Sequence, residues 1–204
     1  MKNEKYVIPN LEIYKKYRDR LLELINGGGI GIFPTETVYG IGVKSSFLDD
    51  YNKIYKIKRR PYDKPLPWII SSREQLNKIT KDINLPEITK KIINKWWPGP
   101  LTIVFNLNDN KSQAIRLTEH EILCEIIKDI DEPIALTSAN ISGDKSPIEF
   151  DDINEDIIKN VDFIIDAGKC KFGKESTIID TSGNLIREGV IKAKEIEEFL
   201  KSLI

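Results

Sequence analysis

The order of helical and strand-like segments constrains the fold of this chain more than any other feature. Apolar residues recur at helical spacing from Ile13 to Ile25, and the run Gly27-Gly28-Gly29 then ends the predicted helix. A short apolar strand follows over Ile30–Phe33 and is terminated by Pro34. Because helical and strand-like segments continue to alternate, they favour an α/β architecture over an all-helical or all-β one.

The rest of the chain contains more segments of both kinds. The predicted strands are Val38–Val43, Trp68–Ile70, Leu101–Leu107, Ile134–Thr137, Phe163–Ile165, Ser176–Asp180 and Leu185–Arg187. The predicted helices are Leu48–Ile57, two surface helices between Ser71 and Lys95 with a break at Pro86, a helix from Thr118 to about Asp129, and a closing helix over Ala193–Leu203. Thr118 and Glu121 match a capping box, with Thr118 as the N-cap. We find no internal repeat or long linker, so residues 1–204 are expected to form a single domain.

Composition narrows the class of protein. The 31 basic and 32 acidic residues nearly cancel, whereas tight nucleic-acid binding normally requires a basic excess. Only two cysteines are present, Cys124 and Cys170, so a disulfide framework is not expected. The sequence begins without a signal-peptide pattern and has no apolar run of about 18 residues. We therefore expect a cytoplasmic protein without a membrane segment.

The segment Lys58-Arg59-Arg60-Pro61-Tyr62-Asp63-Lys64-Pro65 gathers four cations around two prolines, directly after a predicted helix. Proline stiffens the chain, and stiff chain can hold cations convergent, which a site for a phosphate-bearing ligand requires. Lysine and arginine also collect at helix C-termini, where they interact favourably with the macrodipole. Taken alone, the cluster therefore fits either a phosphate site or a solvated helix end.

Three polar segments lie at the ends of predicted strands. Pro34–Gly40 and Thr137–Gly143 each follow a strand, and Lys174–Thr177 precedes one. Loops at strand ends are where α/β sheets build ligand sites, and small hydroxyl and amide groups beside glycines suit carboxylate or phosphate oxygens. Each loop by itself also fits an ordinary Asx or ST turn. Their occurrence together with the cationic cluster favours a ligand site.

The chain resembles the YrdC/TsaC family of L-threonylcarbamoyladenylate synthases. The stretches that carry the resemblance appear in the family's order and span nearly the whole sequence. They are Pro34-Thr35-Glu36-Thr37-Val38-Tyr39-Gly40-Ile41-Gly42, Lys58-x-Arg60-Pro61 with Lys64-Pro65-Leu66, Trp97-Pro98-Gly99-Pro100-Leu101-Thr102, Thr137-Ser138-Ala139-Asn140-x-Ser142-Gly143 with Ser146-Pro147, and Glu175-Ser176-Thr177-Ile178. Any one of these stretches is weak evidence, but the ordered set is highly specific.

The resemblance implies a fold and a reaction. The fold is a twisted open mixed α/β sheet with flanking helices and a concave, positively lined cavity. The reaction condenses L-threonine, bicarbonate and ATP into threonylcarbamoyl-adenylate and releases pyrophosphate. Its product would pass to a separate threonylcarbamoyl transferase complex that modifies the tRNA adenosine beside the anticodon, so tRNA would be an indirect partner.

The resemblance also assigns roles to residues by their positions in the motifs. The family's functional quartet corresponds to Lys58, Arg60, Ser138 and Asn140. The threonine-side contacts correspond to Thr37, Arg116, Leu136 and Ser176. The nucleotide-side contacts correspond to Arg60, Lys64, Ser112, Ser138, Ser146 and Arg187.

The sequence departs from the family pattern in two places. Ile69 stands where many relatives have a histidine, which removes an expected contact to the amino acid. Thr118 replaces the usual proline between Arg116 and His120. The longer family members append a second domain, and the length of this chain matches the single-domain type.

The chemistry can also be argued from charge. A carbamate anion formed from threonine and bicarbonate must attack the α-phosphate of a polyanionic nucleotide, and the two repel each other. Arg60, Lys64 and Lys58 would offset that repulsion, and Mg²⁺ on the phosphates would help. Neither cysteine lies in a motif typical of a reactive thiolate, so we expect catalysis by positioning and electrostatics rather than through a covalent intermediate.

Two other functions remain open from sequence alone. The basic residues around Lys58 would serve an RNA-binding module, although the near-zero net charge is unfavourable for that role. A related carbamoyl-handling enzyme is the nearer alternative, because carbamoyltransferase maturation proteins contain a similar domain. His120 and Cys124 lie four residues apart on a predicted helix, but no third metal ligand is evident, so we predict no protein metal site.

Overall fold

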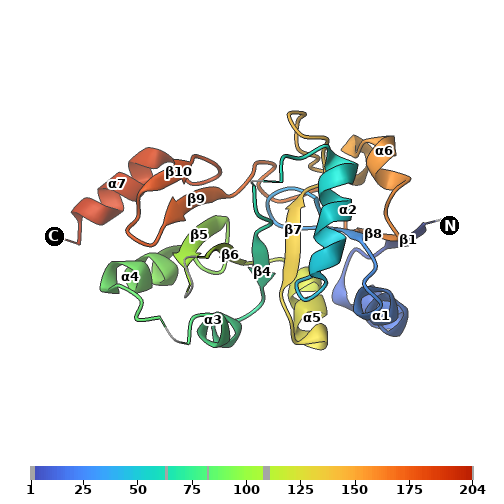
Figure 1. Ribbon diagram of the computed structural model, residues 1–204, viewed down its shortest axis with the longest axis horizontal. Helices are drawn as coiled ribbons and strands as arrows, with labels where there is room; N and C mark the ends of the chain where they lie inside the picture. The colour runs from blue at the N-terminus through green and yellow to red at the C-terminus, as the bar shows by residue number, and fades with distance from the viewer. Residues whose placement is uncertain (1–2, 63, 82, 108–110, 204) are drawn as a thin grey trace.

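Ten strands of the described residues, 3–62, 64–81, 83–107 and 111–203, form one sheet in the computed structural model (Figure 1). In sheet order they are β1 (Glu4–Val7), β8 (Phe163–Asp166), β2 (Gly31–Phe33), β3 (Gly40–Lys44), β7 (Ile134–Ser138), β4 (Trp68–Ile70), β6 (Ser112–Leu117), β5 (Leu101–Asn106), β9 (Thr177–Asp180) and β10 (Leu185–Arg187). Strand pairs are parallel at β1–β8, β2–β8, β4–β6 and β5–β9, and antiparallel elsewhere. The predicted twisted, open and mixed sheet is confirmed.

Helices cover the sheet in three groups, each with its own apolar cluster. The first group is α1 (Leu11–Asn26) and α5 (Glu121–Ile130). The second is α2 (Leu48–Lys58) with the short α6 (Glu155–Ile158), near the 3-10 turn η2 (Phe150–Asp152). The third is α3 (Arg73–Ile79), α4 (Glu87–Trp96) and α7 (Ala193–Lys201), at the C-terminal end of the molecule in Figure 1.

Strand β7 shows how the sheet separates two of these clusters. Ile134 and Leu136 pack with the α1/α5 group, whereas Ala135 between them packs with the α2/α6 group. Side chains alternate between the two faces of a strand, so a strand covered by helices on both faces is apolar along its whole length. The apolar run Ile134–Leu136 in this strand follows from that burial.

Helix α1 ends where the sequence predicts, and it begins at Leu11, two residues before the predicted apolar pattern. The Asn10 side chain accepts a hydrogen bond from the backbone N–H of Ile13 (3.0 Å) and caps the first turn. At the other end Gly28 has φ of 82°, in the left-handed region that a side chain disfavours. The triple glycine therefore stops the helix and lets the chain turn into β2.

The structure corrects the prediction at the start of α5. The helix begins at Glu121 after His120, and Thr118 is not its N-cap. The Thr118 hydroxyl instead donates to Glu36 Oε2 (2.5 Å) and accepts from the His120 backbone N–H (3.2 Å). The hydroxyl therefore accepts from the His120 N–H and not from the Glu121 N–H that the predicted capping box requires.

Other differences involve short or partly polar segments. Strands β1 and β6 were not predicted, and neither were the helical segments η2 and α6. Strand β3 begins at Gly40 rather than at Val38. Only one residue of β1 is buried, and the first three residues of β6 are Ser, Gln and Ala. Such segments lack the apolar pattern on which strand prediction depends.

Candidate functional site

A cavity of about 660 Å³ lies over the central strands of the sheet. On β5, Thr102 and Val104 line it, while Ile103 between them packs into the α3/α4/α7 cluster. On β6, Ala114 and Arg116 line it in the same way. The cavity is therefore the side of β5 and β6 that faces away from that cluster, and strand alternation decides which residues reach it.

The cavity brings together most of the residues that the sequence assigned to a site. Those that line it are Thr37, Arg60, Lys64, Arg116, Leu136, Ser138, Ser176 and Arg187. Four assigned residues, Lys58, Asn140, Ser112 and Ser146, are not among the lining residues. Ile69, where the family pattern has histidine, also lines the cavity, so an apolar side chain occupies that position.

The lining of the cavity is positively charged. Arg60, Lys64, Arg116 and Arg187 face one carboxylate, that of Glu175, among the described lining residues. Partial desolvation lowers the pKa of Arg187; Glu175 opposes that shift, and the cations Arg116 and Arg60 add to it. Arg187 is thus close enough to Arg116 and Arg60 to feel their charge, and all three line the same cavity, as a polyanion site requires.

The loop between β2 and β3 places Thr37 at the cavity. Thr35 Oγ1 accepts hydrogen bonds from the backbone N–H groups of Thr37 (3.0 Å) and Val38 (3.1 Å). This is a local side-chain turn, and the hydroxyls of Thr35 and Thr37 lie 2.8 Å apart. The turn holds the Thr37 hydroxyl toward Arg116, whose Nη1 donates to it (2.5 Å).

A buried ion pair lies behind Thr37. Arg116 Nη1 is 3.4 Å from Glu36 Oε1, and the two side chains are 5% and 2% exposed. The Thr118 hydroxyl holds the other oxygen, Oε2, of the same carboxylate. Glu36 is not among the site residues predicted from the sequence, where its only signal is its position between two threonines in a predicted ligand loop.

The loop after β7 is built around the ammonium group of Lys58. Lys58 Nζ donates to the backbone carbonyl of Ser138, to that of Asn140 (2.6 Å) and to Asn140 Oδ1 (3.4 Å). The Ser138 hydroxyl donates to Asn140 Oδ1 (2.5 Å), and the Ser142 N–H donates back to the Lys58 carbonyl (2.8 Å). Lys58 and Asn140 thus support the loop without lining the cavity. The other two members of the quartet, Arg60 and Ser138, do line it.

Burial changes the charge of Lys58. The residue is 1% exposed, and desolvation, with a smaller contribution from Arg60, lowers its pKa to about 7. Lys58 is therefore a buried amine with a lowered pKa, whereas the basic cluster in the sequence suggested a cation exposed to solvent or ligand. Of the three cations predicted to converge on a ligand, Arg60 and Lys64 line the cavity, and Lys58 does not.

Arg60 orders the segment that follows it. Its Nε donates to the Lys64 carbonyl (3.1 Å) and its Nη2 to the Pro65 carbonyl (3.4 Å). These bonds fold the proline-rich segment back on the guanidinium, so both Arg60 and Lys64 border the same space.

Serine side chains support the other side of the cavity. Ser146 donates to Glu175 Oε1 (2.6 Å), and the Ser176 hydroxyl lies 2.8 Å from that of Thr102. Desolvation raises the pKa of Glu175, but the Ser146 hydrogen bond and nearby positive charge outweigh it, so that the pKa is lowered overall. Ser112 is exposed at the start of β6, opposite Asn106.

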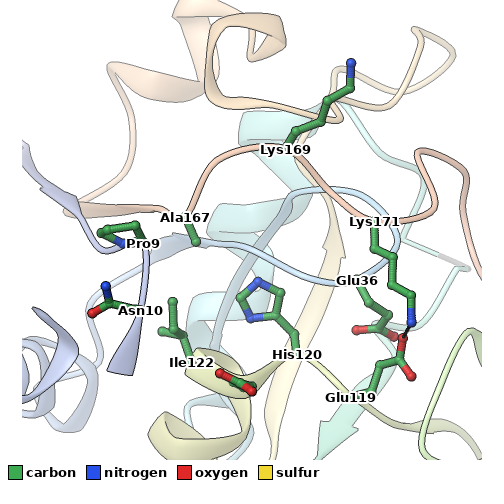
Figure 2. Close-up of a pocket in the computed structure, with 10 residues that line it drawn as sticks. Pro9, Asn10, Glu36, Glu119, His120, Ile122, Ala167, Lys169 and Lys171 are labelled. Carbon is green, nitrogen blue, oxygen red and sulfur yellow. Dashed lines mark hydrogen bonds and ion pairs between the residues drawn. The ribbon is translucent and has the colours of Figure 1, made fainter. Parts of the chain in front are cut away.

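A second cavity of about 430 Å³ lies beside α5 (Figure 2). His120 projects into its centre, and Glu36 lines it from the β2–β3 loop. Lys171 pairs with Glu119 at its edge (2.7 Å), as the dashed line in Figure 2 shows. The described residues contain no group of three His, Cys, Asp or Glu side chains arranged to hold a metal ion.

Neither cysteine has the properties of a nucleophile. Desolvation raises the pKa of both Cys124 and Cys170 to about 11, so each is a neutral thiol at physiological pH. Within the described ranges, no helix combines the length and apolarity needed to cross a bilayer.

Comparison with known proteins gives relatives over most of the chain. A relative from Methanocaldococcus jannaschii is 35% identical over 204 residues, covering 93% of this chain and 96% of that protein. The threonylcarbamoyl-AMP synthase of Pyrococcus abyssi is 37% identical over 188 residues, covering 86% of this chain and 55% of that protein. The crystal structure of P. abyssi Sua5 complexed with L-threonine matches with a TM-score of 0.82 at 34% identity, covering 96% of this chain and 59% of that chain.

The chain therefore spans little more than half the length of the P. abyssi relatives and nearly the whole of the M. jannaschii one. A family model, Sua5_yciO_yrdC, described as "Telomere recombination", matches residues 23–189. That match covers the β2–β3 loop, the basic segment, the Ser138 loop, the strand that carries Arg116, and Ser176 just before β9. With the sheet and the cavity, these matches establish that the chain belongs to the Sua5/YciO/YrdC family.

Proposed function

We propose that this protein is an L-threonylcarbamoyladenylate synthase, which makes threonylcarbamoyl-adenylate and pyrophosphate from L-threonine, bicarbonate and ATP. The observation that carries the proposal is the convergence of Arg60, Lys64, Arg116 and Arg187 on one cavity bordered by hydroxylated loops. The relatives named threonylcarbamoyl-AMP synthase and the L-threonine complex of P. abyssi Sua5 support the same activity.

The reaction joins two anions. The threonine amine and bicarbonate lose water to form a carbamate, and a carbamate oxygen then bonds to the α-phosphorus as the bond to the pyrophosphate oxygen breaks. Fixed cations offset the repulsion and stabilise the charge that builds on the phosphoryl oxygens. Arg60 and Lys64, which border the cavity together, are placed for that role on the nucleotide side.

The two ends of the cavity suit different parts of the substrates. Arg116 would pair with the threonine carboxylate, with Thr37 and Ser176 hydrogen-bonding its polar groups and Leu136 contacting its methyl group. The nucleotide would contact Arg60, Lys64, Ser138 and Arg187, with Ser146 acting through Glu175 and Ser112 at the rim. Lys58 and Asn140 would contribute by shaping the Ser138 loop.

Mg²⁺ would enter with ATP. Among the described lining residues Glu175 is the one carboxylate, and a single carboxylate fits a Mg²⁺ ion that is held mainly by substrate phosphates and water. The ion would neutralise phosphate charge. Glu175 would orient it from the protein side.

The product fits a place in tRNA modification. We infer that a separate threonylcarbamoyl transferase complex consumes the adenylate at the tRNA adenosine beside the anticodon, with tRNA an indirect partner. We also infer a cytoplasmic location, supported by the two free thiols. The single sheet that runs through the described residues supports one YrdC-like domain over residues 1–204.

Pyrophosphate release tests the proposal. The protein is incubated with ATP, Mg²⁺, L-threonine and bicarbonate, and each component is omitted in turn. We expect release to require all of them and threonylcarbamoyl-adenylate to accumulate. Release that is independent of threonine would refute the assignment. Turnover with carbamoyl phosphate in place of threonine and bicarbonate would instead support the carbamoyl-handling alternative.

A further inference from the structure

We propose that Glu36 is a positioning residue for the amino-acid end of the cavity, where it fixes the guanidinium of Arg116. The proposal rests on the function above only in taking L-threonine as the ligand of that end. Glu36 is not a lining residue of the large cavity, and it lines the smaller one behind the β2–β3 loop (Figure 2). It would therefore act on a bound ligand through Arg116.

The geometry fixes the carboxylate from two sides. Glu36 Oε2 accepts the Thr118 hydroxyl at 2.5 Å, while Oε1 faces Arg116 Nη1 at 3.4 Å. The Glu36 backbone carbonyl also accepts the N–H of Phe172 (2.9 Å), which ties the loop to the segment after β8. A carboxylate held in this way has a fixed orientation, and it fixes the orientation of the guanidinium beside it.

Burial makes the pairing necessary. Arg116 is 4% exposed, and a charged group that is so buried requires an opposite charge close by. Glu36 is the carboxylate for which the structure records an ion pair with Arg116. Without its charge, the guanidinium would be expected to turn away from Thr37 toward Glu175, the carboxylate among the described residues that line the cavity.

Arg116 also retains hydrogen-bonding capacity in this arrangement. Its Nη1 donates to Thr37 and forms the ion pair with Glu36, whereas its Nε–H is buried without a hydrogen-bond acceptor and Glu36 Oε1 is buried without a hydrogen-bond donor. A buried donor without an acceptor is unfavourable, and the carboxylate of a bound amino acid beside Thr37 would supply one. Glu36 thus holds Arg116 in an orientation in which a bound carboxylate would accept the remaining Nε–H hydrogen bond.

The test compares Glu36→Gln with a matched control. The amide keeps the shape and can still accept the Thr118 hydroxyl, but it removes the charge. Glu119→Gln is the control, because Glu119 lines the same smaller cavity and pairs with Lys171 instead. Binding of L-threonine and, separately, of ATP is measured by calorimetry for the wild type and both variants.

We expect Glu36→Gln to weaken threonine binding by about tenfold or more, with ATP binding changed by less than about twofold. Glu119→Gln should match the wild type for both ligands. In the double variant Glu36→Gln/Arg116→Gln, threonine binding should be no weaker than in Arg116→Gln alone, since Glu36 acts through Arg116. Unchanged threonine affinity, or an equal loss of ATP affinity, would overturn the proposal.

A ligand-free measurement separates this proposal from the proposed function. The Nε–H NMR signal of Arg116, assigned by its loss in Arg116→Gln, should be protected from solvent exchange in the wild type and in Glu119→Gln. In Glu36→Gln it should shift and exchange rapidly. If wild-type protein binds no threonine, the proposed function fails while this signal still decides the role of Glu36; an unchanged signal in Glu36→Gln overturns it.

Discussion

Lys58 and Asn140 lie against each other, with the ammonium of Lys58 donating to the Asn140 backbone carbonyl at 2.6 Å. The same ammonium bonds the Ser138 carbonyl, and the Lys58 carbonyl accepts the N–H of Ser142. The end of α2 and the loop after β7 are therefore one hydrogen-bonded unit. Because Ser138 faces the cavity from this unit, the position of its hydroxyl depends on a residue that does not line the cavity.

Replacing Lys58 with Met should loosen this unit. Methionine fills similar space but leaves the carbonyl oxygens of Ser138 and Asn140 without their donor, at a cost of about 1–3 kcal/mol for each group. We expect a lower melting temperature and a fall of about tenfold or more in pyrophosphate release. Lys56→Met, an exposed lysine in the same turn of α2, is the control. Equal stability and activity of the two variants would show that the ammonium is dispensable.

The charge of Lys58 should depend on pH near neutrality. Burial and Arg60 lower its pKa from 10.5 to about 7 in the folded protein. Between these values the unfolded chain binds more protons, so the contribution of Lys58 to the free energy of unfolding is fully present above pH 10.5 and is lost as pH falls through about 7. The Cε chemical shift of Lys58, followed by NMR, should titrate near pH 7, and a midpoint near that of exposed lysines would contradict this.

The parts of the site that depend on local pattern were predictable from sequence. The triple glycine gave the end of α1, and the polar residues after β2 and β7 placed Thr37 and Ser138 at strand ends, where the cavity lies. Arg116 was found through the resemblance, although β6, the strand that carries it, was not predicted. Its position opposite Ile69 in the sheet follows from pairing between strands that are distant in sequence.

Long-range contacts account for what the sequence did not reveal. Whether Lys58 points into the cavity or into the Ser138 loop depends on where that loop lies, and it lies about 80 residues further along the chain. The Thr118 hydroxyl donates to Glu36, 82 positions away in the sequence, and accepts from the His120 N–H rather than from that of Glu121. Residue type and spacing identify the groups, but only the packing decides which partner each one takes.

Gly40 is required by close packing inside the cavity. A Cβ atom added there would lie 2.5 Å from Leu136 Cγ, and both residues line the cavity. Gly40→Ala should lower the free energy of unfolding by about 1–3 kcal/mol, measured by urea denaturation, and should weaken threonine binding. Gly40→Ala/Leu136→Ala should recover part of the stability because the clash is relieved. A single variant as stable as the wild type would show that Leu136 moves without cost.

Thiol alkylation should leave activity intact. Desolvation raises the pKa of Cys124 and Cys170 to about 11, so little thiolate forms at pH 7.5. Iodoacetamide at that pH should modify neither residue in the folded protein, as judged by intact mass, and pyrophosphate release should be unchanged. Rapid inactivation together with addition of one alkyl group would identify a reactive thiol and argue for a covalent step.

Arg60 and Arg59 offer the sharpest comparison, because adjacent arginines have different surroundings. Arg60 lines the cavity and bonds the carbonyls of Lys64 and Pro65, while Arg59 pairs with Asp156 at the exposed surface (3.5 Å). Exposed pairs of that kind contribute about 0–1 kcal/mol. Arg60→Ala should reduce pyrophosphate release by about 100-fold or more, since the proposed electrostatic contact to the phosphates would be lost. Arg59→Ala should keep wild-type activity, and both variants should keep the wild-type circular dichroism spectrum. An unchanged rate in Arg60→Ala would remove this residue from the mechanism, whereas an equal loss in both variants would point to a general requirement for positive charge near α2.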